Sequence, residues 1–232
     1  MQTALAVLSL FFCALNSNAQ NGNFKIPNDR KINIGVLVYD GVEIVDTGGP
    51  IDVFVKANNI TGKYKIYTVS ATEKKKIIMD GGTVNLVSQF TIFDAPQSDI
   101  LIIPGTSPEI VRTISKDKNM MDWIVKQNEK TQITMSVCTG GLILANTGLL
   151  DGRAATTHHW SLDELRSHPK IKVKQEARFV ADGKFLTGAG VTSGIDTALE
   201  AVELIHGKDF ADEIAQGMVY DRYNDMDFLL KK

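Results

Sequence analysis

The feature that most constrains the fold is a repeated alternation between short, almost wholly apolar segments and longer amphipathic ones. Four apolar segments have the pattern of strands buried on both faces: Ile32–Tyr39, Tyr64–Val69, Asp99–Ile103 and Ile133–Val137. The segments over 49–58 and 108–130, which lie between them, have the pattern of helices. The alternation predicts an α/β domain with a largely parallel sheet, helices on both faces and right-handed crossovers.

The rest of the chain adds shorter elements. A hairpin is expected over Ile77–Val87, interrupted by Gly81 and Gly82. After the fourth strand we expect a helix over 139–149, a short strand over 154–157 and a helix near 162–166. Two β segments over 171–180 and 184–187 and two terminal helices complete the chain.

Composition limits the function classes. The chain has 232 residues, 44% hydrophobic content and a formal net charge of −2, which suits one domain over 31–232. No basic cluster is interleaved with aromatic residues, so the sequence predicts no nucleic-acid partner. It has four histidines without clustered Cys/His spacing, and we therefore expect no metal site and no cofactor.

The first nineteen residues have the pattern of a secretory signal peptide. An uncharged apolar stretch is followed by a small-x-small ending at Ser17 and Ala19. We expect cleavage after Ala19, a mobile leader over 20–30, and an exported protein, periplasmic or secreted, without membrane association after cleavage. Because Cys13 is lost with the signal, Cys138 is then the one cysteine of the mature chain.

Cys138 follows the strand Ile133–Val137 directly and is followed by Thr-Gly-Gly. The two glycines, Gly140 and Gly141, let substrate and backbone approach closely. A strand that runs straight into a helix at such a residue resembles a nucleophile elbow. The amides at the helix start stabilise a thiolate, so we expect the pKa of Cys138 to lie below 8. The alternative is a packed, unreactive core thiol.

Two other strand ends carry residues that could take part in chemistry, because ligands of open parallel sheets gather beyond the carboxyl ends of the strands. Asp46 lies near the start of the first helix and is either a helix cap or a reactive carboxyl. Glu43, directly after the strand turn, is expected to face solvent. His158 and His159 point to opposite faces, so at most one enters a site, and His158 is either a pocket residue or a packed strand end.

Several motifs together resemble the ThiJ/PfpI superfamily, whose members are class I glutamine amidotransferase-like, and most closely its isonitrile hydratase-like branch. The motifs are D-x-x-G-P over 46–50, IIPG over 102–105, SVCTGG over 136–141, GLLDGRAATTHHW over 148–160 and LTGAGVTSGID over 186–196. The resemblance implies a flavodoxin-like three-layer α/β/α sandwich, commonly a homodimer. It also implies a nucleophilic cysteine, Cys138, and an acidic partner, Asp46.

The resemblance also suggests the roles of smaller residues. Thr139 matches the threonine that follows the nucleophile in the hydratase branch, where PfpI-type peptidases carry histidine. Relatives usually show two glycines that supply backbone donors to the substrate, where this chain has Gly105 and Thr106. The amides of both residues are expected to donate to the substrate, but the Thr106 side chain is expected to narrow the approach. The remaining expected contacts to a small-molecule substrate are Gly140 and His158.

These residues favour hydration of an isonitrile to an N-substituted formamide, with Cys138 as nucleophile and Asp46 as proton donor. One alternative is a cysteine hydrolase or glyoxalase-like enzyme with His158 as base. Another is a non-catalytic ligand-binding or redox-sensing protein that uses Cys138. The sensor half of a transcription regulator is disfavoured, because no helix-turn-helix pair fits the residues after the helix over 194–207.

Overall fold

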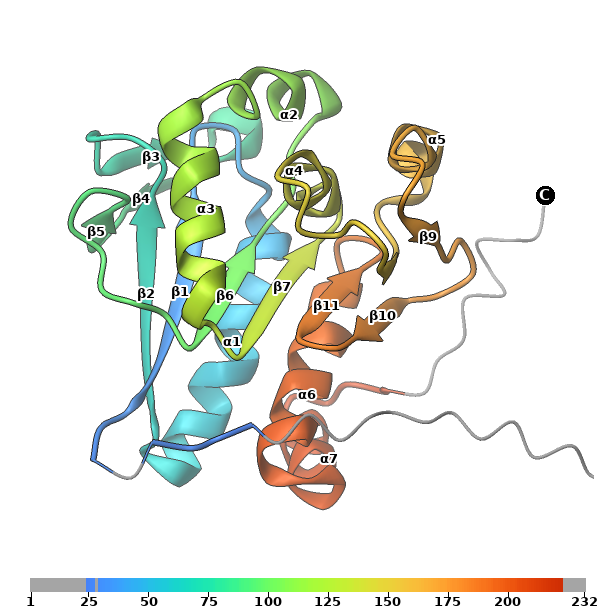
Figure 1. The fold of residues 1–232 in the computed structure, drawn as a ribbon. Coiled ribbons are helices and arrows are strands. Elements are labelled where there is room, and N and C mark those ends of the chain that lie inside the picture. The colour runs from blue at the N-terminus through green and yellow to red at the C-terminus, as the bar shows by residue number, and fades with distance from the viewer. Residues whose placement is uncertain (1–23, 28, 223–232) are drawn as a thin grey trace, which may run out of the picture.

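The computed structural model describes residues 24–27 and 29–222. They form the expected flavodoxin-like sandwich, with helices on both faces of a central sheet (Figure 1). In spatial order the sheet contains β10 (Phe179–Asp182), β11 (Phe185–Gly188), β7 (Ile133–Val137), β6 (Ile100–Ile103), β1 (Ile32–Val38), β2 (Tyr64–Ser70) and β5 (Phe90–Thr91). All neighbours are parallel except β10 and β11.

The apolar runs are explained by burial on both faces. Ile34 of β1 lies between Ile66 of β2 and Ile100 of β6, and every residue of β6 and β7 is buried. This arrangement places the carboxyl ends of β1, β6 and β7 side by side at one edge of the sheet.

Helices cover the two faces in separate groups. α1 (Ile44–Thr61), α6 (Ser193–His206) and α7 (Lys208–Gly217) pack together on one face. The other face carries α2 (Pro108–Ile114), α3 (Lys118–Lys130) and α4 (Gly140–Asn146), with α5 (Leu162–Arg166) against α4 (Figure 1). In the described part of the chain, every helix is too short or too polar to cross a bilayer.

Short elements lie outside the main sheet. β3 (Lys76–Ile78) and β4 (Asn85–Val87) form the expected hairpin, joined through the short helix η1 (Asp80–Gly82), in which Gly81 has a positive φ of 68°. β8 (Ala154–Ala155) pairs in parallel with β9 (Lys172–Val173), and η2 (His159–Ser161) precedes α5.

Three predicted elements differ from the structure. The first helix begins at Ile44 instead of 49, because the Glu43 side chain caps it. The predicted helix over 108–130 is two helices, since Asp117 accepts hydrogen bonds from Asn119 N and Met120 N and so starts a new one. The predicted β segment over 171–180 is divided between β9 and β10, which belong to different sheets.

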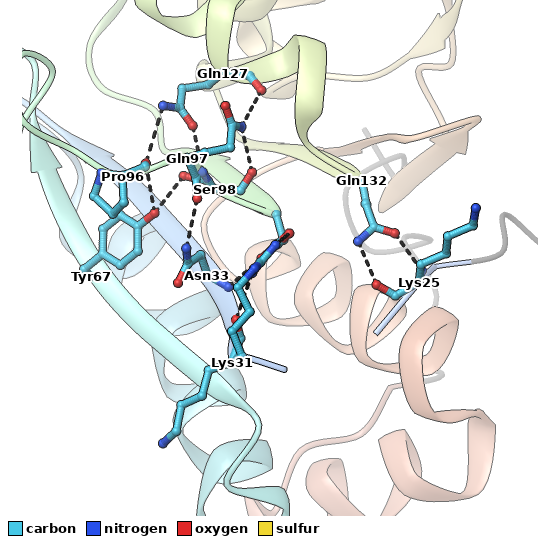
Figure 2. A network of polar contacts seen from close by, with 11 residues as sticks. Lys25, Lys31, Asn33, Tyr67, Pro96, Gln97, Ser98, Gln127 and Gln132 are labelled. Carbon is cyan, nitrogen blue, oxygen red and sulfur yellow. Dashed lines mark hydrogen bonds and ion pairs between the residues drawn. The ribbon is translucent and has the colours of Figure 1, made fainter. Parts of the chain in front are cut away.

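The expected leader over 20–30 makes polar contacts with the domain where the structure describes it. The backbone of Lys25 forms two hydrogen bonds with the side chain of Gln132, and Arg30 pairs with the buried Asp99 carboxylate at 2.6 and 2.9 Å. Figure 2 shows the Lys25–Gln132 contact beside a polar network that includes Tyr67, where the Tyr67 hydroxyl lies 3.1 Å from that of Ser98. Polar partners at this end of the sheet thus hold the segment. The expected signal peptide over 1–19 lies outside the described residues.

Candidate active site

The turn between β7 and α4 has the geometry of a nucleophile elbow. Cys138 has a φ of 57°, a left-handed conformation that a non-glycine residue rarely adopts. Its N–H donates to Gly188 O at 3.0 Å, and its carbonyl accepts from Thr157 Oγ1 at 2.8 Å. Hydrogen bonds on both sides therefore hold the strained residue, whose exposed fraction is 7%.

Two glycines allow the neighbouring strand ends to approach the elbow. A Cβ on Gly140 would lie 2.1 Å from Ile103 O, so only glycine fits where α4 meets the end of β6. A Cβ on Gly105 would lie 2.6 Å from Thr139 Oγ1 and 2.8 Å from Asp46 Oδ2. The sequence predicted such close approach at Gly140, and the structure identifies the β6 backbone as the neighbour.

Asp46 lies in the first turn of α1 and is completely buried. Its Oδ2 accepts a hydrogen bond from Gly105 N at 3.0 Å, whereas Oδ1 has no hydrogen-bond partner. Burial, and next the negative charge of Glu43, raise the pKa of Asp46 to about 7. Near neutral pH the carboxyl is therefore protonated in a large fraction of molecules, and Asp46 is not the helix cap.

Burial raises the pKa of the Cys138 thiol above its usual range, and the charge of Asp46 raises it further. The Thr139 amide lowers it, but this effect is smaller than that of burial. Contact between the Cys138 thiol and the Asp46 carboxyl raises the pKa of the thiol and lowers that of the carboxyl. The geometry does not give either Asp46 oxygen a well-formed hydrogen bond from the sulfur. The expected pKa of Cys138 below 8 is therefore wrong. The amide at the start of α4 lowers this pKa by less than burial and the neighbouring Asp46 carboxyl raise it.

Glu43 is a functional candidate that the sequence placed in solvent. It is half-buried, and its Oε2 accepts from Asp46 N at 2.6 Å. Its own N–H donates to Gly105 O at 2.9 Å, so Glu43 and Asp46 bind the same residue, Gly105, through its carbonyl and its amide. Its position three residues before Asp46 was the signal that could have identified it as the cap of that helix.

Thr139 and Thr106 bind each other. Thr139 Oγ1 donates to Thr106 O at 2.6 Å and accepts from Thr106 N at 2.8 Å. The Thr106 hydroxyl in turn donates to Gly41 O at 2.6 Å. The amides of Gly105 and Thr106, which the sequence assigned to substrate, are thus engaged by Asp46 and Thr139, and the Thr106 hydroxyl is turned to the β1–α1 connection.

Among the described residues, no hydrogen bond joins His158 to Cys138, as one would join a general base to its nucleophile. It is half-buried, its Nδ1 accepts weakly from Trp160 N at 3.4 Å, and its ring lies 4.4 Å from that of His159. Burial and His159 lower its pKa. Asp46 and Glu43 are the side chains that most perturb Cys138.

Tyr39 is a second residue that sequence reasoning missed. Its hydroxyl donates to Pro104 O at 2.6 Å, and burial and then the charges of Asp46 and Cys138 raise its pKa. Its place at the end of the first buried strand was the available signal. Among residues 24–27 and 29–222, no group of three or more His, Cys, Asp or Glu residues could hold a metal ion.

Comparison with known proteins relates this site to one family. The model of the DJ-1/PfpI family matches residues 32–204. The isonitrile hydratase of Pseudomonas putida is 32% identical over 190 residues, which are 82% of this chain and 78% of that protein. The transcriptional regulator CdhR of Pseudomonas aeruginosa is 30% identical over 161 residues, and this chain spans about half (46%) of its length.

Solved structures agree on the fold. A ThiJ/PfpI family protein from Pseudomonas syringae superimposes with a TM-score of 0.73 at 30% identity, over 92% of this chain and 84% of that one. Drosophila melanogaster DJ-1beta has a TM-score of 0.71 at 17% identity, over 82% of this chain and 99% of that one, a likeness of fold alone. The chain belongs to the DJ-1/PfpI family.

Proposed function

We propose that this protein hydrates isonitriles to N-substituted formamides, with Cys138 as nucleophile and Asp46 as proton donor. The observation that carries the proposal is the Asp46 carboxyl. It is completely buried beside the thiol, with Oδ1 unpaired and a pKa of about 7. Hydration requires a group that delivers a proton at neutral pH to a carbon that sulfur has just attacked.

The steps balance with one proton held by the Cys138–Asp46 pair. The thiolate attacks the terminal carbon while Asp46 gives that carbon its proton, which yields a thioimidate and a carboxylate. Water then adds to the carbon, and Asp46 passes a proton from this water to the nitrogen. Collapse expels the sulfur as thiolate, and the hydroxyl proton returns to Asp46 as the formamide leaves.

The raised pKa of Cys138 bears on the first step. In the molecules in which Asp46 is ionised, transfer of the thiol proton to Asp46 forms the reactive pair, thiolate beside carboxylic acid. The Thr139 amide interacts with the sulfur and lowers its pKa, so it stabilises the thiolate. Thr139 itself supports the site by holding Thr106, since both interactions of its hydroxyl are with that residue.

A second candidate function is ligand binding or redox sensing without turnover. The observation in its favour is the burial of Cys138, whose exposed fraction is 7% and whose pKa is raised. Such a thiol reacts slowly in the absence of a ligand. The hydrolase alternative has less support, because His158 is not among the main groups that perturb the thiol.

Homodimer formation, export and removal of the first nineteen residues remain proposals that accompany this function. Light scattering of the purified protein tests the first, with a dimer expected. Intact mass of protein from the native host tests the others, with a chain beginning at Gln20 expected.

A substrate panel separates the candidate functions. Small isonitriles, glyoxals and activated esters are offered to the wild type and to Cys138→Ala, and products are identified by mass spectrometry. Formamide from isonitriles with the wild type alone supports hydration. Turnover of esters or glyoxals alone supports the hydrolase alternative, and no turnover supports the sensor.

A further inference from the structure

We infer that Glu43 is a positioning residue whose carboxylate keeps Asp46 in its acid form. The inference deepens the proposed function, on which its catalytic consequence rests. Three observations support it: the direct bond between the two residues, the isolation of Asp46, and the small number of other charges that face it.

The direct bond holds the Glu43 carboxylate against the backbone of Asp46. Glu43 Oε2 accepts from the backbone N of Asp46 at 2.6 Å, three residues along the first turn of α1. Glu43 also donates its own N–H to Gly105 O, while Gly105 N donates to Asp46 Oδ2. Both residues therefore bind Gly105, and the Glu43 carboxylate can leave Asp46 only if its own bond to the Asp46 amide breaks.

Asp46 has little else to stabilise a negative charge. It is 0% exposed, accepts one backbone hydrogen bond at Oδ2, and has an unpaired Oδ1. A buried carboxylate without a cation or a full set of donors is costly, so a second negative charge nearby favours protonation. Glu43 is half-buried and so keeps contact with water, whereas Asp46 does not.

Among the described residues, the groups that act most on the pKa of Asp46 include no cation. The end of β1 contributes Tyr39, the elbow contributes Cys138, and the residue of the β6 end that bonds to Asp46 is Gly105, through its backbone amide. Tyr39 and Cys138 are acids themselves, and burial raises the pKa of each. After burial, Glu43 is therefore the side chain that most favours the protonated form of Asp46, in agreement with its contribution to the raised pKa of Asp46.

A pair of substitutions separates the charge of Glu43 from its capping role. Glu43→Ser and Glu43→Asp both place a preferred N-cap residue before α1, but only the second keeps the charge. Asp52→Asn is the matched control, because it removes an exposed carboxylate elsewhere on the same helix. Thermal melts confirm that each variant is folded.

The readout is the titration of Asp46 itself, followed by carboxyl ¹³C NMR on aspartate-labelled protein and assigned by the loss of its signal in Asp46→Asn. In Glu43→Ser the midpoint of the Asp46 titration should fall by about one pH unit, which is the usual effect of removing a nearby charge of the same sign. Glu43→Asp and Asp52→Asn should leave it within about 0.3 pH units. An unchanged midpoint in Glu43→Ser, or an equal shift in Asp52→Asn, overturns the inference. If Glu43→Ser does not fold, a midpoint in the wild type near the ordinary aspartate value of about 3.9 overturns it as well.

A second arm ties this role to catalysis. In the pH profile of isonitrile turnover, the limb on which Asp46 loses its proton should move to lower pH in Glu43→Ser by the same amount as the NMR midpoint. A limb that stays in place while the midpoint moves contradicts the catalytic part of the inference. A wild type without isonitrile turnover contradicts the proposed function, and the NMR titration still decides the role of Glu43.

Discussion

The backbone amide of Gly105 donates to Oδ2 of Asp46 across 3.0 Å. This bond joins the end of β6 to the first turn of α1, and it uses an amide that the sequence assigned to substrate. The other carboxylate oxygen is left unpaired inside the protein. The site is thus organised around one buried carboxyl beside a strained cysteine, and the following predictions test that arrangement.

Asp46→Asn should lower isonitrile turnover by about 10²–10⁴, the usual contribution of a general acid. Asparagine keeps an oxygen that can accept from Gly105 N, so the link between α1 and β6 is retained. Steady-state rates measure the effect, and Asp52→Asn, on the exposed side of the same helix, serves as the control. Near-normal turnover in Asp46→Asn would mean that the proton comes from another group.

The same substitution should change how stability depends on pH. The pKa of Asp46 is raised from 3.8 to about 7 in the folded protein, so between these values the folded state binds a proton that the unfolded state has lost. The free energy of unfolding of the wild type therefore decreases as pH rises through this window, by about 1.4 kcal/mol for each pH unit, and levels off above it.

Asp46→Asn removes this dependence. Urea unfolding at about pH 5 and about pH 8 should show a smaller difference in the variant than in the wild type. Equal differences in the two proteins would show that Asp46 titrates in its ordinary range in the folded state.

Cys138 should alkylate slowly with iodoacetamide in the absence of substrate. Burial and Asp46 raise its pKa, so the apparent pKa from the rate profile should lie above the free-cysteine value of about 8.5. Stopped-time mass spectrometry of the modified peptide gives the rates. An apparent pKa below about 8 would show that the thiolate is favoured even in the resting site.

Gly105→Ala should damage the site more than the fold. The added Cβ would lie 2.6–2.8 Å from Thr139 and Asp46, and such overpacking costs about 1–3 kcal/mol. Turnover should be lost at temperatures where the variant is still folded, as followed by circular dichroism and rates together.

Gly48→Ala is the control for this substitution. Gly48 lies inside α1, and a Cβ added there would have no neighbouring atom within 4 Å. Alanine should therefore stabilise the protein by about 0.5–1 kcal/mol without loss of turnover. Equal effects of the two alanines would contradict the role of close approach at Gly105.

Patterns of apolar residues predicted most of the fold because burial on both faces leaves a direct trace in the sequence. β1, β6 and β7 are apolar almost throughout, and the turn at Cys138 was expected from Gly140 and Gly141 after it. The break between α2 and α3 was missed because the helical pattern of the sequence continues across it. The break comes from Asp117, whose side chain caps the start of α3.

The residues of the site were easier to name than their partners. Cys138 and Asp46 stand at strand ends, where the topology predicts a site. By contrast, the binding of Thr139 to Thr106 and of Glu43 to Asp46 depends on how three strand ends meet. The raised pKa of Cys138 follows from burial beside a carboxyl, which a local motif does not show.

Covalent trapping shows whether Cys138 attacks the isonitrile carbon. Wild-type protein is mixed with excess isonitrile, quenched in acid within the first turnovers, and analysed by intact mass and peptide mapping. The wild type should show a transient adduct on Cys138 with the added mass of one isonitrile, followed by N-substituted formamide. Cys138→Ala should show neither the adduct nor the formamide. Formamide produced by Cys138→Ala at the wild-type rate, or no adduct and no formamide from the wild type, would contradict attack by Cys138.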